Sequence, residues 1–193
     1  MNRICVYAGS NVGARPAYAA AAERLAGALV RRGLGVVYGG GNVGLMGVLA
    51  DATLERGGEV IGVIPEAMLA REVGHRELSE LRVVGSMHER KALMADLADG
   101  FVALPGGYGT IEELVEIVTW SQLGLHEKPC GLLDVEGFYA PLVAFFDHAV
   151  TEGFVRPQHR AMLLVDDDPD ALLDAFTKWT PPAVHKWIDR DQT

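Results

Sequence analysis

Three glycines and two carboxylates lie close together near the middle of the chain. Residues 104–113 read LPGGYGTIEE and follow the apolar run 101–103. Gly106, Gly107 and Gly109 carry no side chain that would keep a ligand away from the backbone. A helix predicted from Thr110 adds unpaired N–H groups and a partial positive charge at its start. We therefore expect this segment to bind an anion, most simply a phosphate.

Two roles fit Glu113 in this segment. Thr110 and Glu113 have the Thr-x-x-Glu spacing of a capping box, in which the threonine caps the helix and the glutamate bonds back to the cap. A carboxylate beside a phosphate-anchored sugar can instead stabilise an oxocarbenium ion or activate water. These residues alone leave both roles open.

A second glycine segment follows an apolar run at residues 35–38. Gly39, Gly41 and Gly44 satisfy the Gly-x-Gly-x-x-Gly dinucleotide pattern, and Glu66 follows further on. An NAD-dependent oxidoreductase is therefore an alternative, although this segment belongs to the second strand–helix unit rather than the first. The Walker phosphate-binding pattern and the Gly-x-Ser-x-Gly nucleophile elbow are both absent from the sequence.

A cationic pair, Arg90 and Lys91, opens the helix predicted before the central strand. Adjacent helix residues point about 100° apart, so only one of the two can face a given ligand. A planar guanidinium suits phosphate or adenine recognition, and the start of this helix is expected at the ligand edge of the sheet. The alternative is a solvated pair that forms surface ion pairs.

The composition describes one globular domain. With 193 residues, 49% of them hydrophobic and 22% charged, we expect a single domain at 1–180 and a C-terminal tail at 181–193. The net charge of −9 argues against nucleic-acid binding. No apolar run reaches the ~18 residues of a membrane span, so we expect a cytoplasmic protein that does not enter a membrane. Cys5 and Cys130 are expected as reduced thiols, and the histidines lack metal-ligand spacing, so no metal site is expected.

Apolar runs alternate with helical patterns along the chain. Strands are predicted at residues 3–8, 35–38, 59–64, 81–84, 100–103, 130–133 and 162–165. Helices are predicted at about 16–32, 44–56, 87–98, 110–123, 138–152 and 168–178, and residues 65–80 are expected to be irregular. The fold class is α/β: a single-domain, Rossmann-like, doubly wound parallel sheet of about seven strands with helices on both faces. Glycine loops after the first, second and fifth strands then meet at the edge where ligands bind.

The central segment also carries a family resemblance. Residues 105–113 match the signature PGGxGTxxE, and the similarity extends to residues 38–47, 87–91 and 119–124. Over residues 3–165 the chain resembles the LONELY GUY (LOG) family of cytokinin riboside 5′-monophosphate phosphoribohydrolases, often mislabelled as lysine decarboxylases. The resemblance implies hydrolysis of the N-glycosidic bond of an adenosine-type 5′-monophosphate to the free base and ribose 5-phosphate, without a cofactor, in a homodimer.

Site residues follow from the resemblance in the same way. It implies that Arg90 and Glu113 are the catalytic pair. It also implies a nucleotide site that consists of Ser10, Glu72, Arg90, Lys91, Gly106, Gly107, Tyr108, Gly109, Thr110, Ile111, Glu112, Glu113 and Thr119. Whether the base is isopentenyladenine, zeatin or plain adenine is left open.

The main alternative is a non-catalytic nucleotide or molybdenum-cofactor carrier of related fold. A carrier needs the glycine loops but not an acid–cation pair. For the implied homodimer, the helix predicted at 110–123 is expected to supply part of the interface through its apolar residues Ile117, Val118, Trp120 and Leu123.

Overall fold

The computed structural model describes residues 1–69, 75 and 77–182, and it contains one seven-stranded sheet. Every pair of neighbouring strands is parallel. The strands are β1 Arg3–Tyr7, β2 Gly35–Tyr38, β3 Val60–Pro65, β4 Glu80–Val84, β5 Gly100–Ala103, β6 Cys130–Leu133 and β7 Leu163–Asp166. The predicted parallel sheet is therefore confirmed.

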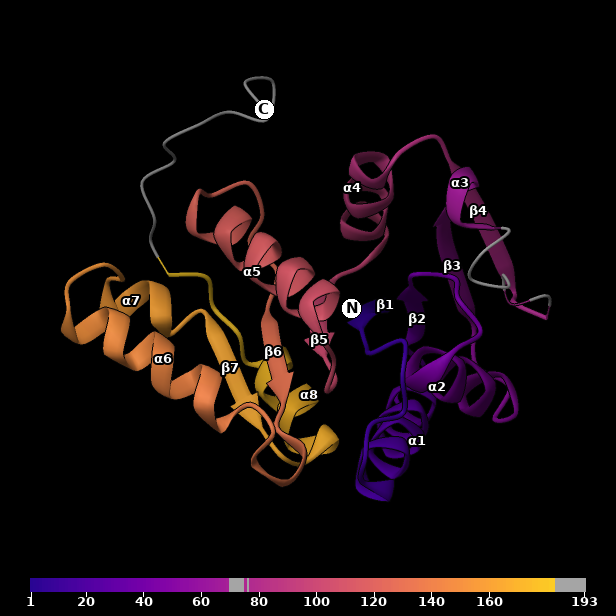
Figure 1. The fold of residues 1–193 in the computed structure, drawn as a ribbon, viewed down its shortest axis with the longest axis horizontal. Coiled ribbons are helices and arrows are strands. Elements are labelled where there is room, and N and C mark those ends of the chain that lie inside the picture. The colour runs from indigo at the N-terminus through magenta and orange to yellow at the C-terminus, as the bar shows by residue number, and fades with distance from the viewer. Residues whose placement is uncertain (70–74, 76, 183–193) are drawn as a thin grey trace.

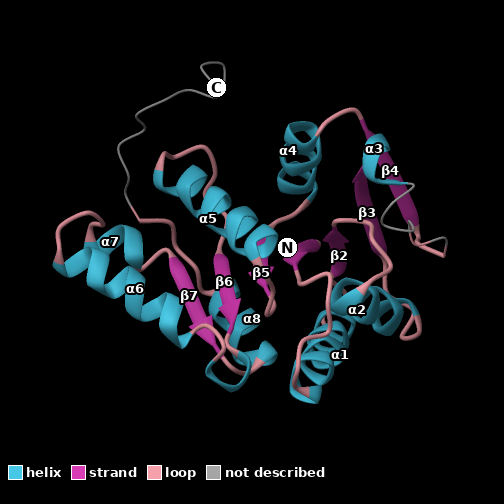
Figure 2. Ribbon diagram, viewed as in Figure 1, coloured by secondary structure: helices cyan, strands magenta, loops and turns pink. Residues whose placement is uncertain are grey.

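Helices cover both faces of this sheet (Figures 1 and 2). They are α1 Pro16–Arg31, α2 Gly44–Leu54, α3 Glu66–Leu69, α4 Met87–Leu97, α5 Tyr108–Gln122, α6 Ala140–Thr151, α7 Pro157–Arg160 and α8 Pro169–Thr177, with a 3₁₀ turn η1 at Val135–Gly137. The helices α1, α2 and α8 pack on one face, and α4, α5 and α6 pack on the other. This arrangement confirms the predicted α/β class.

The central strand β1 contributes to the core on both of its faces. Ile4 and Val6 pack into the apolar cluster under α1, α2 and α8, whereas Cys5 and Tyr7 pack into the cluster under α4, α5 and α6. All four side chains are at most 5% exposed. A strand that is buried on both faces consists of consecutive apolar residues, which explains why residues 4–8 stand out in the sequence as an apolar run.

The strand order is β4-β3-β2-β1-β5-β6-β7. Successive strands move outward from β1 to β4 on one side of the sheet and from β5 to β7 on the other. The direction of winding therefore reverses between β1 and β5. Ligands of open parallel sheets bind at such a reversal, outside the carboxyl ends of the strands. The glycine loops after β1 and β5 lie at this position.

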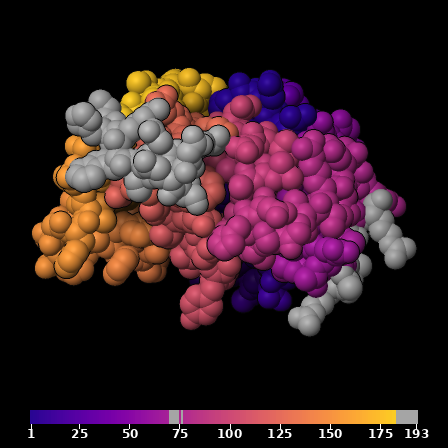
Figure 3. Space-filling model, turned by 90° about the horizontal axis from the view of Figure 1, so that it is seen from above, coloured from indigo at the N-terminus to yellow at the C-terminus, as the bar shows by residue number. Residues whose placement is uncertain are grey.

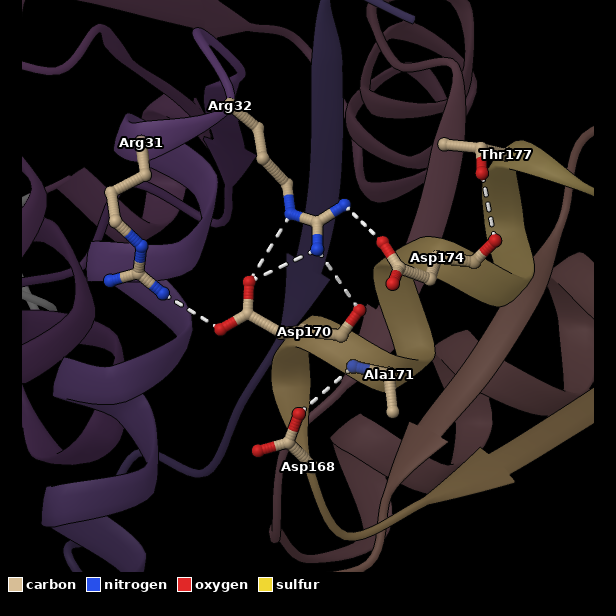
Figure 4. A network of polar contacts seen from close by, with 7 residues as sticks. All are labelled: Arg31, Arg32, Asp168, Asp170, Ala171, Asp174 and Thr177. Carbon is tan, nitrogen blue, oxygen red and sulfur yellow. Dashed lines mark hydrogen bonds and ion pairs between the residues drawn. The ribbon is translucent and has the colours of Figure 1, made fainter.

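Charged side chains tie the last helix to the first (Figure 4). The Arg32 guanidinium donates hydrogen bonds to Asp170 Oδ1 at 3.0 Å and to Asp174 Oδ1 at 2.7 Å, and Arg31 donates one to Asp170 Oδ2 at 2.7 Å. Asp168 caps α8, because its Oδ1 accepts a hydrogen bond from the backbone N–H of residue 171 at 2.9 Å. The ion pairs of Arg31 and Arg32 hold α8 against the end of α1, on the sheet face that both helices cover.

Element boundaries differ from the prediction in a few places. Segment 65–80 contains the four-residue helix α3, and η1 and α7 were not predicted because each is too short to show a period. Residues 70–74, 76 and 183–193 lie outside the described residues, so the boundary between a domain at 1–180 and a tail at 181–193 stays a prediction. Among the helices of the described part, none is long and apolar enough to cross a bilayer.

Candidate functional site

Three glycine loops meet at the carboxyl edge of the sheet. The Gly9 N–H donates to the Pro105 carbonyl at 3.1 Å, which joins the loops after β1 and β5. The Leu45 N–H donates to the Gly9 carbonyl at 3.0 Å, which joins the loops after β1 and β2. The predicted convergence of these loops is therefore confirmed by direct backbone hydrogen bonds.

Two glycines are required by the close approach of these loops. A β-carbon at Gly44 would lie 2.3 Å from backbone atoms of Ser10 and Asn11, and Gly44 has a φ of +57°. A β-carbon at Gly106 would lie 2.1 Å from Thr110 Oγ1 and 3.0 Å from the backbone nitrogen of residue 9. No side chain fits at either position, which explains part of the glycine content without any ligand.

Gly107 and Gly109 are different, because they are exposed and have open space where a β-carbon would lie. Neither has a positive φ, so nothing in the described part of the chain requires glycine there. A side chain would stand between solvent and the N–H groups at the start of α5. Beside them is a cavity of about 240 Å³, lined by the loops at 9–13 and 105–107 and by Tyr18, Leu45 and Phe138.

The helix α5 begins at Tyr108, two residues earlier than predicted. Gly107 is the cap residue, and as a glycine it has no side chain that could make a capping hydrogen bond. The capping-box interpretation, in which Thr110 is the cap residue, is therefore wrong, because Thr110 already lies in the first turn. Its side chain is buried and folds back against Gly106 instead. The cap residue offers no side chain to the first N–H groups of α5, which suits them to an anion.

A capping motif does occur one helix earlier, at the start of α4. Ser86 Oγ accepts a hydrogen bond from the Glu89 N–H at 3.1 Å, and Glu89 Oε2 accepts one from the Gly85 N–H at 2.8 Å. The Ser-x-x-Glu spacing at residues 86–89 is its sequence signal, which the sequence analysis missed. This motif fixes the start of the helix that carries Arg90.

Arg90 is a buried cation with few partners. Its side chain is 6% exposed, and Nη2 donates to the Gly39 carbonyl at 3.2 Å. Nη1 lies 3.6 Å from the sulfur of Met87 and 3.9 Å from that of Met68, both weak acceptors. Nε is buried and has no partner among the described residues. A buried guanidinium is costly unless it is paired, so this arrangement is typical of a group that meets an anion or an acceptor on a ligand.

Glu113 lies in the second turn of α5 and is partly buried. Its charge and that of Arg90 both act on the Cys5 thiol in β1. Burial raises the pKa of Cys5, the negative charge of Glu113 raises it further, and the positive charge of Arg90 lowers it. Burial also raises the pKa of Tyr7, and Cys5 and Glu113 add to that rise. The helices that carry these two residues, α4 and α5, pack on the same face of the sheet as Cys5.

Lys91 connects the two helices that carry this pair. Its Nζ donates to Glu112 Oε1 at 2.8 Å and to Glu116 Oε1 at 2.9 Å. Burial lowers the pKa of Lys91, but its hydrogen bonds to Glu112 and Glu116 and their negative charges together raise it by more, so the net pKa lies above its usual value. Both carboxylates are thus held by a cation. Within the described ranges, no three His, Cys, Asp or Glu side chains come together as metal ligands would.

Three other expected site residues lie at or beside the glycine loops. Ser10 is exposed in the loop after β1. Tyr108 is the first residue of α5 and is 95% exposed. Ile111 is partly buried, and its N–H donates to the carbonyl of the cap residue at 3.1 Å. Their positions fit the loop-edge site that the sequence predicts.

Thr119 lies elsewhere. Its Oγ1 donates to the Val115 carbonyl at 2.7 Å, and its side chain lines a separate cavity of about 130 Å³ between α5, α6 and α7. In Figure 3 the salmon segment that includes α5 lies between the magenta segment of α4 and the orange segment of α6 and α7. The structure therefore does not bring Thr119 to the cavity between the glycine loops. Glu72 lies outside the described residues.

Comparison with known proteins identifies relatives along most of the chain. A family model described as "Possible lysine decarboxylase" matches residues 46–176. A cytokinin riboside 5′-monophosphate phosphoribohydrolase of Oryza sativa subsp. japonica is 53% identical over 162 residues, which cover 84% of this chain and 67% of that protein. One of Arabidopsis thaliana is 47% identical over 179 residues, which cover 93% of this chain and 82% of that protein.

Solved structures share the fold at much lower sequence similarity. The molybdenum cofactor carrier protein of Chlamydomonas reinhardtii has a TM-score of 0.68 at 20% identity, covering 90% of this chain and 95% of that chain. The molybdenum cofactor binding protein of Rippkaea orientalis has a TM-score of 0.67 at 19% identity, covering 92% and 96%. These likenesses establish the fold alone. The family match and the relatives at 47–53% identity show that this chain belongs to the LONELY GUY (LOG) family of cytokinin riboside 5′-monophosphate phosphoribohydrolases.

Proposed function

We propose that this chain hydrolyses the N-glycosidic bond of cytokinin riboside 5′-monophosphates, and of AMP, to give the free base and ribose 5-phosphate. One observation carries the proposal: α5 starts at a glycine cap where the glycine loops meet, and α4 and α5, which carry the buried Arg90 and the partly buried Glu113, pack on the same face of the sheet. Relatives at 47–53% identity are named for this activity.

The proposal places the 5′-phosphate on the glycine loop at residues 106–109. The N–H groups of the first turn of α5 would donate to it, and Ser10 would add a hydroxyl from the loop after β1. The open space over Gly107 and Gly109 supports this placement. Backbone donors suit a chain whose net charge is −9, because they attract an anion at one place without a basic surface.

The bound phosphate would hold C1′ of the ribose within reach of Glu113. When the C1′–N bond breaks, its electron pair leaves with the base, and Glu113 stabilises the positive charge that develops on the sugar. Water then adds its oxygen to C1′, oriented by Glu113, and the proton that it releases neutralises the base. Arg90 would donate from its spare N–H to the phosphate or to the leaving base. The reaction needs water and no cofactor.

The remaining predicted residues keep a binding role in this proposal. They are Glu72, Lys91, Gly106, Tyr108, Thr110, Ile111 and Glu112. Thr119 is left out of this role, because it lines the separate cavity between α5, α6 and α7. Lys91 and Glu112 hold each other, so their first contribution is to fix α4 against α5. In this way they set the distance between Arg90 and Glu113.

A non-catalytic nucleotide or molybdenum-cofactor carrier is the second candidate function. It is kept because two proteins with such names share the fold, with TM-scores of 0.67 and 0.68. A carrier would use the glycine loops but would have no need for a buried guanidinium opposite a carboxylate. The charges of Arg90 and Glu113 therefore favour the hydrolase.

The proposed assembly is a homodimer. Val115 in α5 is 40% exposed and lines the cavity between α5, α6 and α7. Phe145 in α6 is 61% exposed, and Phe154, between α6 and α7, is 88% exposed. Large apolar side chains exposed on these elements support association. Ile117, which we expected at the interface, is 3% exposed and packs in the core instead. Light scattering at micromolar concentration should give twice the 20.7 kDa mass of one chain, and a monomeric mass would remove this part of the proposal.

The cytoplasm is the proposed location. Cys5 and Cys130 are both free and buried, as thiols in a reducing compartment usually are. Burial raises the pKa of Cys130 to about 12, which keeps that thiol protonated and unreactive. Fractionation of the source cells would test this assignment.

The test of the function is to incubate the protein with AMP and, separately, with isopentenyladenosine 5′-monophosphate, and to separate the products by chromatography. We expect free adenine or isopentenyladenine in amounts equal to the ribose 5-phosphate formed. The ratio of the two initial rates would establish the preferred base. Tight nucleotide binding with no base released would favour the carrier instead.

A further inference from the structure

We propose that Tyr139 is a positioning residue for the loop that binds the phosphate. The proposal rests on the proposed function for the identity of the ligand. Tyr139 belongs to the segment between η1 and α6, far from that loop in the sequence, and its side chain is 1% exposed. It would act through the backbone of the loop without touching the substrate.

The contact is a buried hydrogen bond at the end of β5. Tyr139 Oη donates to the Leu104 carbonyl at 2.6 Å, and Leu104 is fully buried. Leu104 stands immediately before the loop residues Pro105, Gly106 and Gly107. Burial raises the pKa of Tyr139, and the charge of Asp134 adds to that rise, so the hydroxyl stays protonated and donates at every physiological pH.

The proline explains why this hydrogen bond matters for position. The peptide between Leu104 and Pro105 has no N–H, so a partner can hold its plane only through the Leu104 carbonyl. Tyr139 supplies that partner. The next carbonyl, of Pro105, accepts a hydrogen bond from the Gly9 N–H at 3.1 Å. The hydrogen bonds to the Leu104 and Pro105 carbonyls therefore fix the orientation of the backbone that leads into Gly106, Gly107 and the first turn of α5.

The structure also fixes Tyr139 itself. Its backbone N–H donates to Asp134 Oδ1 at 2.6 Å. Between these two residues the chain reverses through Glu136 and Gly137, with φ values of 51° and 73°. A left-handed conformation at a residue other than glycine is unfavourable, so the surrounding contacts must hold this turn in place. The turn after β6 thus places the Tyr139 hydroxyl against the Leu104 carbonyl, directly before the glycine loop.

The experiment is titration calorimetry with AMP, and with inorganic phosphate alone, on the Tyr139→Phe protein. The variant keeps the ring and removes the hydroxyl, which leaves the buried Leu104 carbonyl without its partner. We expect Kd for both ligands to rise about tenfold, because donors displaced within the loop bind the phosphate less well. If the protein hydrolyses AMP, KM should rise by a similar factor and kcat should change by less than about threefold.

Tyr38→Phe is the matched control. Tyr38 is fully buried like Tyr139, but its hydroxyl has no hydrogen-bond partner among the described residues. Removing it should leave the Kd values for AMP and phosphate unchanged. A purely structural role for Tyr139 would lower the melting temperature of Tyr139→Phe with both Kd values within about twofold of wild type, and that result would overturn the proposal.

A second pair of variants covers the case in which Tyr139→Phe does not fold. Asp134→Ala removes the acceptor that fixes the Tyr139 backbone, and it should weaken phosphate binding in the same direction. Asp134→Asn keeps an acceptor oxygen and should restore wild-type binding. Equal phosphate binding by both Asp134 variants would contradict the proposal. Because phosphate binding is measured directly, an absence of AMP hydrolysis in the wild type would refute the proposed function and leave this test intact.

Discussion

Replacing Gly39 by alanine should disable Arg90 without changing Arg90 itself. A β-carbon at Gly39 would lie 1.9 Å from Arg90 Nη2 and 3.1 Å from Cζ, whereas ordinary contact begins at 3.4 Å. The backbone at Gly39 does not have a positive φ, so alanine is allowed there and the guanidinium must move instead. The displacement needed at Nη2 is about 1.5 Å, the difference between 1.9 and 3.4 Å.

This displacement predicts the size of the effect on catalysis. The hydrogen bond from Nη2 to the Gly39 carbonyl, 3.2 Å long, cannot survive unchanged. Its loss should lower the free energy of unfolding by roughly 1 kcal/mol. A catalytic group that is misplaced by about 1 Å typically costs ~10²-fold in rate, so we expect kcat/KM for AMP to fall by about that factor.

The assay is the initial rate of adenine release from AMP, with the melting temperature measured on the same preparations. Gly27→Ala is the matched control, because Gly27 lies inside α1 and an added β-carbon there would meet only the flexible ends of two side chains, Arg31 at 3.3 Å and Arg56 at 3.6 Å. It should leave the rate unchanged and stabilise the helix by roughly 0.5–1 kcal/mol. A Gly39→Ala protein with a wild-type rate would refute the reasoning that the position of Arg90 limits turnover.

Three further predictions concern the phosphate, the cation and pH. Adenosine should be hydrolysed at least ~10²-fold more slowly than AMP, because the phosphate anchors the sugar; comparable turnover would remove the phosphate from the glycine loop. Arg90→Ala should abolish measurable turnover, and calorimetry with AMP then separates its two roles: binding weakens if Arg90 meets the phosphate and persists if Arg90 acts on the leaving base. Burial lowers the pKa of His159, and the positive charge of Arg156 lowers it further. The imidazole is therefore harder to protonate in the folded protein than in the unfolded chain. Stability should therefore fall as the pH drops below about 6.5, the unfolded value, and urea unfolding of His159→Gln should show a weaker pH dependence over that range.

The sheet was predictable because its five inner strands are buried on both faces, whereas the edge strands β4 and β7 are partly exposed. Each inner strand then appears as a short apolar run between helices, and glycines mark the turns at one edge. Cys130–Leu133 agrees with the predicted strand to the residue, and the convergence of the loops follows from right-handed crossovers. Helix ends were less certain, because a glycine such as Gly107 can serve as a cap without any side-chain signal.

The contacts between helices could not be predicted from the sequence. The bridge from Lys91 to Glu112 and Glu116 depends on how α4 lies against α5, which no local pattern encodes. The same holds for Tyr139, whose partner Leu104 lies on another strand unit. The sequence predicts Arg90 and Glu113 as the catalytic pair, but only the packing shows that Arg90 is buried and that α4 and α5 cover the same face of the sheet.

The catalytic role of Glu113 is tested most directly by the turnover of AMP by the Glu113→Gln protein, with the AMP affinity measured on the same sample. Glu113 lies in the second turn of α5, and the cap residue of this helix is Gly107, so the amide should leave the start of the helix intact. Loss of one preorganised charge typically lowers turnover ~10²-fold or more. We predict that loss together with unchanged or tighter AMP binding. Adenine release at near wild-type rate would contradict the assignment of Glu113 as the catalytic carboxylate.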